Sequence, residues 1–315
     1  MKILVIGAGV IGTVYGYALA EAGNEVTHYV RPGKKVQFEQ GIKIRLLDGR
    51  EKKAQEKEVF YPMRVTETLT PQHDFDLILV SVRHYQIESV LPLLQENAGK
   101  ANVLFFNGNW GNFDAVEKAL PGKFLWGFPV AGGGYHGQEL DAALLDEVRL
   151  GEIDSQPTAR LEQIARLFEG AGLKVDIQKN ILHWLWVHFA INCGIIAAAF
   201  KAGGAHQLLN SVSHLRLGIL AGREALAVCK ARGVDVASYE DARMFYSPAL
   251  LGAAAVWLMM KTNLPARKIM ECHTAVDELQ AMIRDLHNSA EQLHVPLPVM
   301  RSLKPYVDHP VMNRV

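Results

Sequence analysis

The stretch MKILVIGAGVIGTVYGYALAEA, residues 1–22, decides the fold of the first half of the chain. Lys2 to Ile6 is a short run of apolar, mostly branched residues and predicts a buried strand. Residues 7–12, GAGVIG, follow at once and fit the pattern G-x-G-x-x-G. From Val10 onward the sequence predicts a helix. A strand, a glycine turn and a helix in this order are the setting in which the motif binds a dinucleotide.

The three glycines of this motif have separate roles. Gly7 makes the tight turn, Gly9 lets a pyrophosphate approach the backbone, and Gly12 lets the helix pack close to the strand. Val10 and Ile11 open the helix, whose first N–H groups and partial positive charge favour a phosphate. The alternative is a glycine-rich turn that binds nothing, which the strand–turn–helix setting disfavours.

The composition bounds the class of protein. The 315 residues are enough for two domains, and a hydrophobic content of 49% can form their cores. Lys+Arg and Asp+Glu are both 33, so the net charge of zero argues against a general nucleic-acid binder. The three scattered cysteines indicate neither a disulfide framework nor a metal site, and a strand stands where a signal peptide would begin. We therefore expect a cytoplasmic protein.

The end of the second expected strand, Glu25 to Val30, predicts which dinucleotide binds. A NAD-binding protein places an Asp or Glu here, about 20 residues after the glycines, to hold the ribose 2′-hydroxyl. In this chain residues 29–35 read YVRPGKK and contain three cations but no acid. Arg31 in particular favours a 2′-phosphate and therefore NADP. The alternative is that Arg31 lies on a solvated loop, as surface cations usually do.

Strands and helices alternate through the rest of the first half. This alternation implies a Rossmann-type, doubly wound sheet in an α/β domain. Arg83 and Asn107 each follow an expected strand, at the ends where such sheets bind ligands. Residues 130–137, VAGGGYHG, predict a turn between strands. The expected strands are 42–46, 57–61, 74–82, 102–106, 124–128, 144–150 and 173–177, and two of the expected helices are 85–96 and 158–169.

Beyond about residue 180 the pattern predicts helices only. The predicted domains are therefore 1–178, which binds the dinucleotide, and 179–315, which is all-helical. A first helix at 181–200 has no charged residue and is long enough to cross a bilayer, but no basic cluster flanks it, so a buried core helix is favoured. The proline-rich tail from residue 296 is expected to be loosely ordered. The other expected helices are 212–232, 238–260 with a break at Ser247-Pro248, and 265–293.

A Rossmann-type half followed by an all-helical half resembles the ketopantoate reductase (2-dehydropantoate 2-reductase) family. Four stretches carry the resemblance: GAGVIG at 7–12, Arg31, Asn107-Gly108, and WLWVHFAINC at 184–193, which looks like the family's W-x-K-x-x-x-N-C. The resemblance implies NADP(H) bound by the glycine loop, Arg31, Arg83 and Asn107. It implies a small 2-oxo acid as the substrate, with Asn107 near both it and the nicotinamide. A homodimer through the helical domain is one expectation for the assembly.

The substrate half departs from the family pattern. The family has a lysine at position 188, which donates a proton to the carbonyl oxygen, and this chain has His188. Asn192 is kept four residues later, so both side chains share one helical face. The family's second Asn falls on Ile196, so one substrate hydrogen bond is absent. Its late Glu falls near Val276, with Glu271, Asp277 and Glu278 close by in sequence.

Two smaller differences lie in the cofactor half. The loop 107–112, NGNWGN, is one residue longer than the common Asn-Gly-x-Gly-Asn form. Arg83 stands where the family has a lysine, which keeps the charge. The cofactor half therefore matches the family more closely than the substrate half.

The residues themselves are compatible with the reduction of a ketone, which needs a hydride, an acid and groups that hold the substrate. His188 can supply the proton near neutral pH, because an imidazole has an ordinary pKa of about 6.5. The alternative is a hydrogen-bonded histidine on a buried helix. With Asn192 and Asn107, His188 completes the predicted catalytic set.

Three functions stay open at this stage. The first is a NADPH-dependent reductase of a 2-oxo acid, 2-dehydropantoate or a relative. The second is an opine- or hydroxyacid-type dehydrogenase on the same two-domain plan, with another substrate. The third is a non-catalytic protein that binds NADPH as a sensor. The sequence names no substrate, because the pocket positions are the ones that depart from the family.

Overall fold

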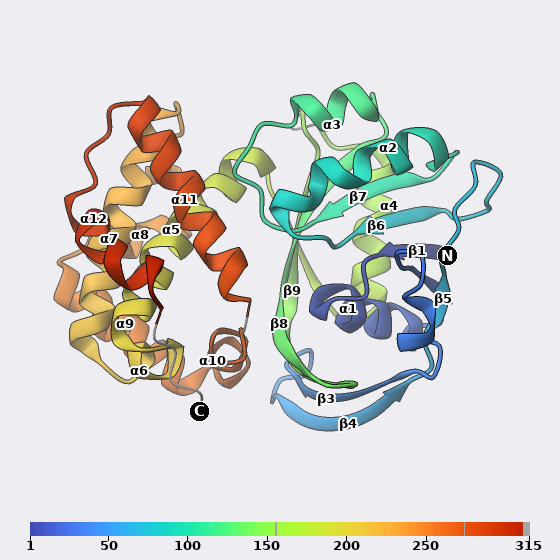
Figure 1. Cartoon of the computed structure of the whole chain (residues 1–315), viewed down its shortest axis with the longest axis horizontal. Helices are drawn as coiled ribbons and strands as arrows, with labels where there is room; N and C mark the ends of the chain where they lie inside the picture. The colour runs from blue at the N-terminus through green and yellow to red at the C-terminus, as the bar shows by residue number, and fades with distance from the viewer. Residues whose placement is uncertain (155, 274, 311–315) are drawn as a thin grey trace. The chain divides into compact units, whose positions relative to one another are not determined.

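The computed structural model describes residues 1–154, 156–273 and 275–310. The chain divides into two compact units, Met1–Ile181 and Leu182–Val315 (Figure 1). The first unit holds the sheet, and the second unit is helical. The boundary predicted between residues 178 and 179 falls in the turn before the first helix of the second unit.

Ten strands of the described residues form one sheet in the first unit. The strands run in the order β4-β3-β9-β8-β7-β6-β1-β2-β5, and β10 pairs with β9. The part β5-β2-β1-β6-β7-β8 is parallel throughout and has the strand order of a Rossmann sheet. The predicted α/β fold class is therefore confirmed. The strands are β1 (Lys2–Ile6), β2 (Glu25–Tyr29), β3 (Ile42–Asp48), β4 (Gln55–Tyr61), β5 (Arg64–Thr66), β6 (Leu77–Val80), β7 (Asn102–Phe106), β8 (Phe124–His136), β9 (Glu139–Gly151) and β10 (Lys174–Ile177).

The glycine-rich residues 130–136 are part of a strand, so the predicted turn over 130–137 is wrong for most of its length. β8 continues to His136 and pairs antiparallel with β9. At Gly133 the strands come so close that a Cβ atom would lie 2.2 Å from the carbonyl oxygen of Asp141. A glycine is therefore needed at this position for β8 and β9 to pack against each other. The turn itself is short and contains Gly137, whose φ is +65°.

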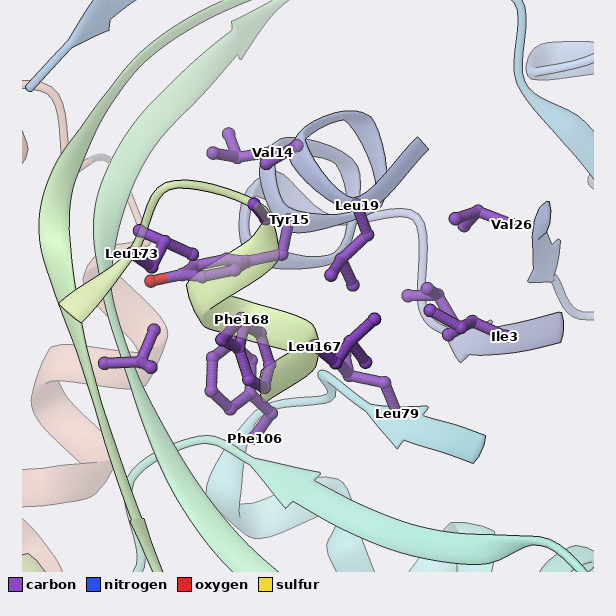
Figure 2. Close-up of a cluster of buried hydrophobic side chains, with 14 of the residues drawn as sticks. Ile3, Val14, Tyr15, Leu19, Val26, Leu79, Phe106, Leu167, Phe168 and Leu173 are labelled. Atoms are coloured by element: carbon purple, nitrogen blue, oxygen red, sulfur yellow. The ribbon is translucent and has the colours of Figure 1, made fainter. Parts of the chain in front are cut away.

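Helices cover both faces of this sheet. Alternate residues of a strand point to opposite faces, and on one face Ile3, Leu79 and Phe106 share a core with Tyr15 and Phe168 (Figure 2). Tyr15 comes from α1 and Phe168 from α4, so these two helices cover that face. On β7 the intervening Phe105 stacks on Trp126 at a ring distance of 4.8 Å. The helices of the first unit are α1 (Val10–Glu21), α2 (Ile87–Asn97), α3 (Asp114–Ala119) and α4 (Ala159–Gly170), with short 3-10 turns η1 (Lys35–Gln37) and η2 (His84–Gln86).

His28 is a fully buried histidine of β2 beneath α1. Its Nε2 atom lies 3.1 Å from the hydroxyl of Tyr61. A Cβ atom at Gly16 of α1 would lie 2.5 Å from the same Nε2 atom, so the helix needs glycine there to pass over the ring. Burial lowers the pKa of His28 to about 4, against a smaller opposing effect of the Gly7 carbonyl. The neutral imidazole is therefore the form that the fold accepts.

We expect this histidine to make the first unit sensitive to acid. Because the folded pKa lies below the unfolded value of about 6.5, the contribution of His28 to stability is complete above that value and falls as pH drops towards 4. Between pH 7 and 4.5 the loss should be about 2–3 kcal/mol. Urea unfolding at both pH values measures it, and His28→Gln should show a smaller difference. An equal loss in the variant and the parent would contradict the prediction.

Asp48 is a useful internal reference for that experiment. Burial raises the pKa of Asp48, but hydrogen bonds from Arg50 and Lys57 outweigh it and lower the pKa to about 2. A carboxylate with this pKa contributes fully to stability above the unfolded value of about 3.9 and loses that contribution only as pH falls from there towards 2. A loss of stability above pH 4.5 therefore does not come from this buried ion cluster.

The second unit consists of helices, as predicted. The break expected at Ser247-Pro248 separates α8 from α9, and the helix expected over 265–293 is two helices, α10 and α11. The helices are α5 (Ile181–Ala202), α6 (Ala205–Leu209), α7 (Val212–Ala231), α8 (Glu240–Tyr246), α9 (Ala249–Thr262), α10 (Leu264–Glu271), α11 (Val276–Gln292) and α12 (Pro298–Asp308), with a 3-10 turn η3 (Val236–Ser238).

The tail from residue 296 contains a helix, so the expectation of a loosely ordered tail is wrong for residues 298–308. Pro298 begins α12, a position where proline is tolerated because its missing N–H needs no partner. The carboxylate of Glu224 accepts the next two N–H groups, from Val299 and Met300, both at 2.9 Å. Residues 311–315 of the predicted tail lie outside the described residues.

α5 is the apolar helix whose length and composition resemble those of a membrane span. Within the described part of the chain it is the one helix long and apolar enough to cross a bilayer by length and composition. In the fold, 61% of its most apolar window is buried. This burial is typical of the core helix of a helical domain.

Candidate active site

The glycine motif forms the turn between β1 and α1. Gly7 has a φ of +110°, which L side chains rarely adopt, so the tight turn requires glycine. Gly9 is the N-cap residue of α1, and Val10 is the first helical residue. The first N–H groups of a helix have no partner within it, so the N–H groups of Val10, Ile11 and Gly12 are available to an anion by position.

Gly9 and Gly12 differ sharply in their surroundings. A Cβ atom at Gly12 would lie 2.2 Å from the Gly7 carbonyl oxygen and 2.6 Å from Ser81 Oγ. A Cβ atom at Gly9 would meet no protein atom within 4 Å. Gly12 is therefore required by the fold itself, whereas the space beside Gly9 is open. Such a space is what a pyrophosphate needs to approach the backbone.

A tyrosine that sequence analysis missed supports this turn. The hydroxyl of Tyr135, on β8, lies 2.8 Å from Thr13 Oγ1 and donates to the Ala8 carbonyl oxygen at 3.1 Å. Thr13 is fully buried in the first turns of α1. The strand β8 thus fixes the glycine loop from a point more than 100 residues away. No local motif marks Tyr135, because its role depends on how β8 runs past α1.

The predicted phosphate-binding arginine lies on the loop after β2. Arg31, Lys34 and Lys35 are all exposed. Among the described residues the Arg31 side chain has neither an ion pair nor a hydrogen bond. The β2 strand pairs directly with β1, and the Gly7 N–H donates to the carbonyl of Tyr29 at 3.3 Å. Arg31 therefore leaves the sheet beside the glycine turn.

Arg83 and Asn107 follow the next two parallel strands, β6 and β7, at the same edge of the sheet. The Arg83 guanidinium donates to the hydroxyl of Tyr85 at 2.7 Å. Asn107 Nδ2 donates to the Val82 carbonyl oxygen at 2.7 Å, which ties the two loops together. All the predicted cofactor-binding residues thus lie at the carboxyl edge of the parallel strands, where open α/β sheets bind ligands.

The side-chain oxygen of Asn107 has no hydrogen-bond partner within the described structure. Asn107 is 8% exposed. A buried amide oxygen without a hydrogen bond carries a free-energy cost. A ligand that donates an N–H or O–H group at this edge would remove that cost. The open space at Gly9 and the acceptor at Asn107 both fit a nicotinamide dinucleotide.

The predicted acid and its partner lie one helical turn apart on α5. His188, Asn192 and Ile196 are half-buried, whereas Val187 and Phe189 beside them are buried. The three half-buried residues therefore form one partly exposed stripe of the helix. The His188 ring lies nearly parallel to that of Trp184, with a centroid distance of 4.9 Å and an interplanar angle of 17°. This stacking fixes the direction of the imidazole.

The carboxylates considered as alternatives are placed differently. Glu271 accepts a hydrogen bond from Arg267 at 2.9 Å and pairs with Nδ1 of His206 at 3.0 Å. This network joins α6 to α10. Asp277 is exposed and Glu278 is half-buried in the first turn of α11. The described residues contain no group of three or more His, Cys, Asp or Glu side chains that could hold a metal ion.

A comparison with protein-family models matches residues 3–153 to the family described as Ketopantoate reductase PanE/ApbA. Among curated proteins, the chain is 25% identical over 197 residues to the 2-dehydropantoate 2-reductase of Pyrococcus abyssi. That alignment covers 62% of this chain and 62% of the relative. The chain therefore matches a little under two thirds of the relative's length.

Solved structures extend the likeness of the fold to the second unit. The 2-dehydropantoate 2-reductase of Geobacter metallireducens gives a TM-score of 0.74 at 15% identity, covering 98% of this chain and 99% of that one. A ternary complex of D-mandelate dehydrogenase with NADH and anilino(oxo)acetate gives 0.71 at 17% identity, with coverage of 98% and 97%. A dimeric ketopantoate reductase from Staphylococcus aureus gives 0.67 at 15%, with 98% of both chains covered.

The family model and the fold agree with the pattern found in the residues. The family model covers residues 3–153 of the sheet-containing unit. These residues include the glycine turn, Arg31, Arg83 and Asn107. The structural neighbours have both the sheet and the helices. On this basis residues 3–153 match the ketopantoate reductase family, and the whole chain has the fold of solved ketopantoate reductases.

Proposed function

We propose that this protein reduces a 2-oxo acid, 2-dehydropantoate or a relative, to the 2-hydroxy acid with NADPH. The observation that carries the proposal is the edge of the sheet at Gly9 and Asn107. An open approach to a helix N-terminus and an unpaired buried amide oxygen lie there together. Relatives named 2-dehydropantoate 2-reductase support the reaction class.

The cofactor would be held by residues of the first unit. The glycine turn from Gly7 to Gly12 would bind the pyrophosphate, and Arg31 would bind the 2′-phosphate. Asn107 Oδ1 would accept a hydrogen bond from the nicotinamide amide. Arg83 would add a positive charge at the same edge. When bound, the nicotinamide supplies the hydride.

Residues of the second unit would hold the substrate and move the proton. The imidazolium of His188 would donate a proton to the oxygen of the substrate carbonyl as negative charge develops there. Asn192, one turn away, would orient the substrate by a hydrogen bond from its side-chain amide. Trp184 positions His188 by stacking on its ring. His188 and Asn192 would thus act as acid and substrate holder.

A different hydroxyacid dehydrogenase activity is the second candidate. Ile196 continues the half-buried stripe of His188 and Asn192 with an apolar side chain. An apolar residue there would favour a 2-oxo acid with an apolar or aromatic side chain over the hydroxylated side chain of 2-dehydropantoate. The similarity to D-mandelate dehydrogenase supports including phenylglyoxylate in the tests.

The test is NADPH oxidation followed by absorbance with a panel of 2-oxo acids. We expect turnover of 2-dehydropantoate, or of phenylglyoxylate if the second candidate holds. Reduction only when an amine is added would indicate an opine-type dehydrogenase. NADPH binding without turnover of any oxo acid would contradict an enzyme and favour a sensor.

The choice between the two nicotinamide cofactors provides a separate prediction. NADPH should bind about 10- to 100-fold more tightly than NADH, because a guanidinium–phosphate contact is worth about 1.5–3 kcal/mol. Arg31→Ala should remove most of this preference and leave NADH binding nearly intact. Fluorescence titration with both cofactors measures it, with Arg64→Ala, an exposed arginine on β5, as the matched control. Equal affinities in the parent would contradict the role of Arg31.

We also propose the setting in which this enzyme works. It acts in the cytoplasm on a small molecule, with no nucleic-acid or membrane partner. It forms a homodimer through the helical unit, as the dimeric ketopantoate reductase from Staphylococcus aureus supports.

A further inference from the structure

One helix of the second unit is apolar on its outer side as well as its inner side. On α9 the inner residues Gly252, Ala253, Val256 and Met260 are buried. Two pairs of large side chains are exposed on the other side, Leu250 and Leu251 at 60% and 64%, and Leu258 and Met259 at 60% and 40%. Ala254 and Ala255 lie between them and are exposed too. These six residues, 250, 251, 254, 255, 258 and 259, are called the α9 stripe below.

The exposed hydrophobic residues of the α9 stripe are clustered, whereas exposed hydrophobic residues on a protein surface are usually isolated. No ionisable residue occurs between Pro248 and Met260. The first cation after it, Lys261, lies against the Trp257 ring at 4.7 Å from the centroid. Tyr246 and Leu264 extend the patch at its ends, at 52% and 57% exposure. Half of the large hydrophobic side chains that the described residues expose thus lie between residues 246 and 264.

The apolar area of this patch is close to what a dimer requires. At about 25 cal/mol per Å² and 1.5–3 kcal/mol for a buried large side chain, the exposed parts of the six large side chains add up to roughly 200–400 Å². A standard interface buries about 800 Å² per partner, of which somewhat more than half is apolar. The α9 stripe and its ends would therefore supply about half or more of the apolar part of such an interface.

The order of large and small residues fits a second copy of the same helix. Around the midpoint between Ala254 and Ala255, large residues stand at equal distances on both sides. In an antiparallel pair related by a twofold axis, Leu251 would face Leu258 of the partner copy, and alanine would face alanine at the axis. Small side chains at the crossing let two helices approach to about 8 Å. In a twofold interface the same patch must complement itself in this way.

We propose that two copies of this chain associate through the α9 stripe, packed antiparallel around a twofold axis. Figure 1 shows α9 among the helices of the second unit. This inference rests on the homodimer included in the proposed function, and it names the interface. A stripe without charges has nothing with which to select a partner of complementary charge, and its symmetric order of sizes favours its own copy.

Light scattering and sedimentation of the full chain measure its oligomeric state. The parent is compared with a variant that carries a charged side chain at the twofold axis. The parent should be a dimer at micromolar concentration. Ala255→Glu should be a monomer, with a dissociation constant raised at least about 100-fold, because like charges would meet across the axis. Leu293→Glu is the matched control, since Leu293 is an exposed apolar residue of the same unit at 39% exposure. It should remain a dimer.

A mixture of variants tests the twofold arrangement itself. Ala255→Glu and Ala255→Lys should each be monomeric, and a mixture of the two should regain the mass of a dimer. Circular dichroism of each variant should match the parent, since the substituted side chain is exposed. NADPH oxidation measured in parallel keeps this result separate from the proposed reaction, because a failed reaction with an intact dimer leaves the interface standing.

Two results would overturn the proposal. The first is a parent that is monomeric at micromolar concentration. The second is a folded Ala255→Glu variant that is still a dimer. In the first case, flotation of the parent but not of Ala255→Glu with neutral phosphatidylcholine vesicles would make the α9 stripe a membrane contact.

Discussion

Replacing His188 by alanine should lower the rate of 2-oxo acid reduction by about 10²–10⁴, the usual contribution of a positioned general acid. The half-buried ring is held in one direction by Trp184, so removing it takes away a prepared donor. NADPH affinity should stay nearly unchanged, because the residues proposed to bind the cofactor lie on the first unit. Steady-state rates with the best oxo acid and a fluorescence titration with NADPH measure the two effects separately.

A second histidine of the same helix provides the matched control. His183 also stacks on a tryptophan, Trp186, at a ring distance of 5.5 Å. His183→Ala should therefore test the loss of a stacked imidazole without the loss of the acid, and its rate should stay within a few-fold of the parent. A parallel loss in both variants would indicate damage to α5 rather than to the chemistry.

The lysine variant tests the nature of the donor. With histidine as the acid, the rate should fall as pH rises through the range in which an imidazole loses its proton, about 6–8. His188→Lys should hold the rate to higher pH. If His188→Ala is as fast as the parent, the residue only packs on its helix. The proton donor must then be sought among Glu271, Asp277 and Glu278 or in water.

The parts of the fold that could be predicted are those fixed by local sequence. β1, the glycine turn and α1 are neighbours in the chain, and the need for glycine at position 7 follows from one backbone angle. The tail helix α12 was missed because its stability depends on a distant residue. Glu224, about 75 positions away, accepts the N–H groups that open it. The prolines around it suggested disorder, although proline is favourable at a helix start.

The same distinction applies to the candidate site. The cofactor-binding positions stand at predictable points, directly after strands, so their common edge follows from the strand order. The support of the glycine loop by Tyr135 could not be predicted, because it depends on β8 continuing through three glycines. The sequence of 130–137 suggested a turn, since glycine usually breaks strands. In the fold Gly133 allows the two strands to pack closely.

Two alanine variants of the glycine turn should separate cofactor binding from folding. Gly9→Ala adds a methyl group that meets no protein atom within 4 Å, at a backbone conformation of φ −75° and ψ −174° that alanine adopts freely. The free energy of unfolding should change by no more than about 0.5 kcal/mol. The methyl group would occupy the space of the pyrophosphate, so the dissociation constant for NADPH should rise about 100-fold or more.

Gly12→Ala is the counterpart, because its methyl group would lie 2.2 Å from the Gly7 carbonyl oxygen. Overpacking against the backbone should cost about 1–3 kcal/mol of stability, and NADPH binding should be lost as well. Thermal unfolding and NADPH titration of both variants give the result. Only Gly12→Ala should unfold at a lower temperature, whereas both should lose the cofactor. If Gly9→Ala binds NADPH as tightly as the parent, the space beside Gly9 does not hold the pyrophosphate, and the proposed cofactor site fails with it.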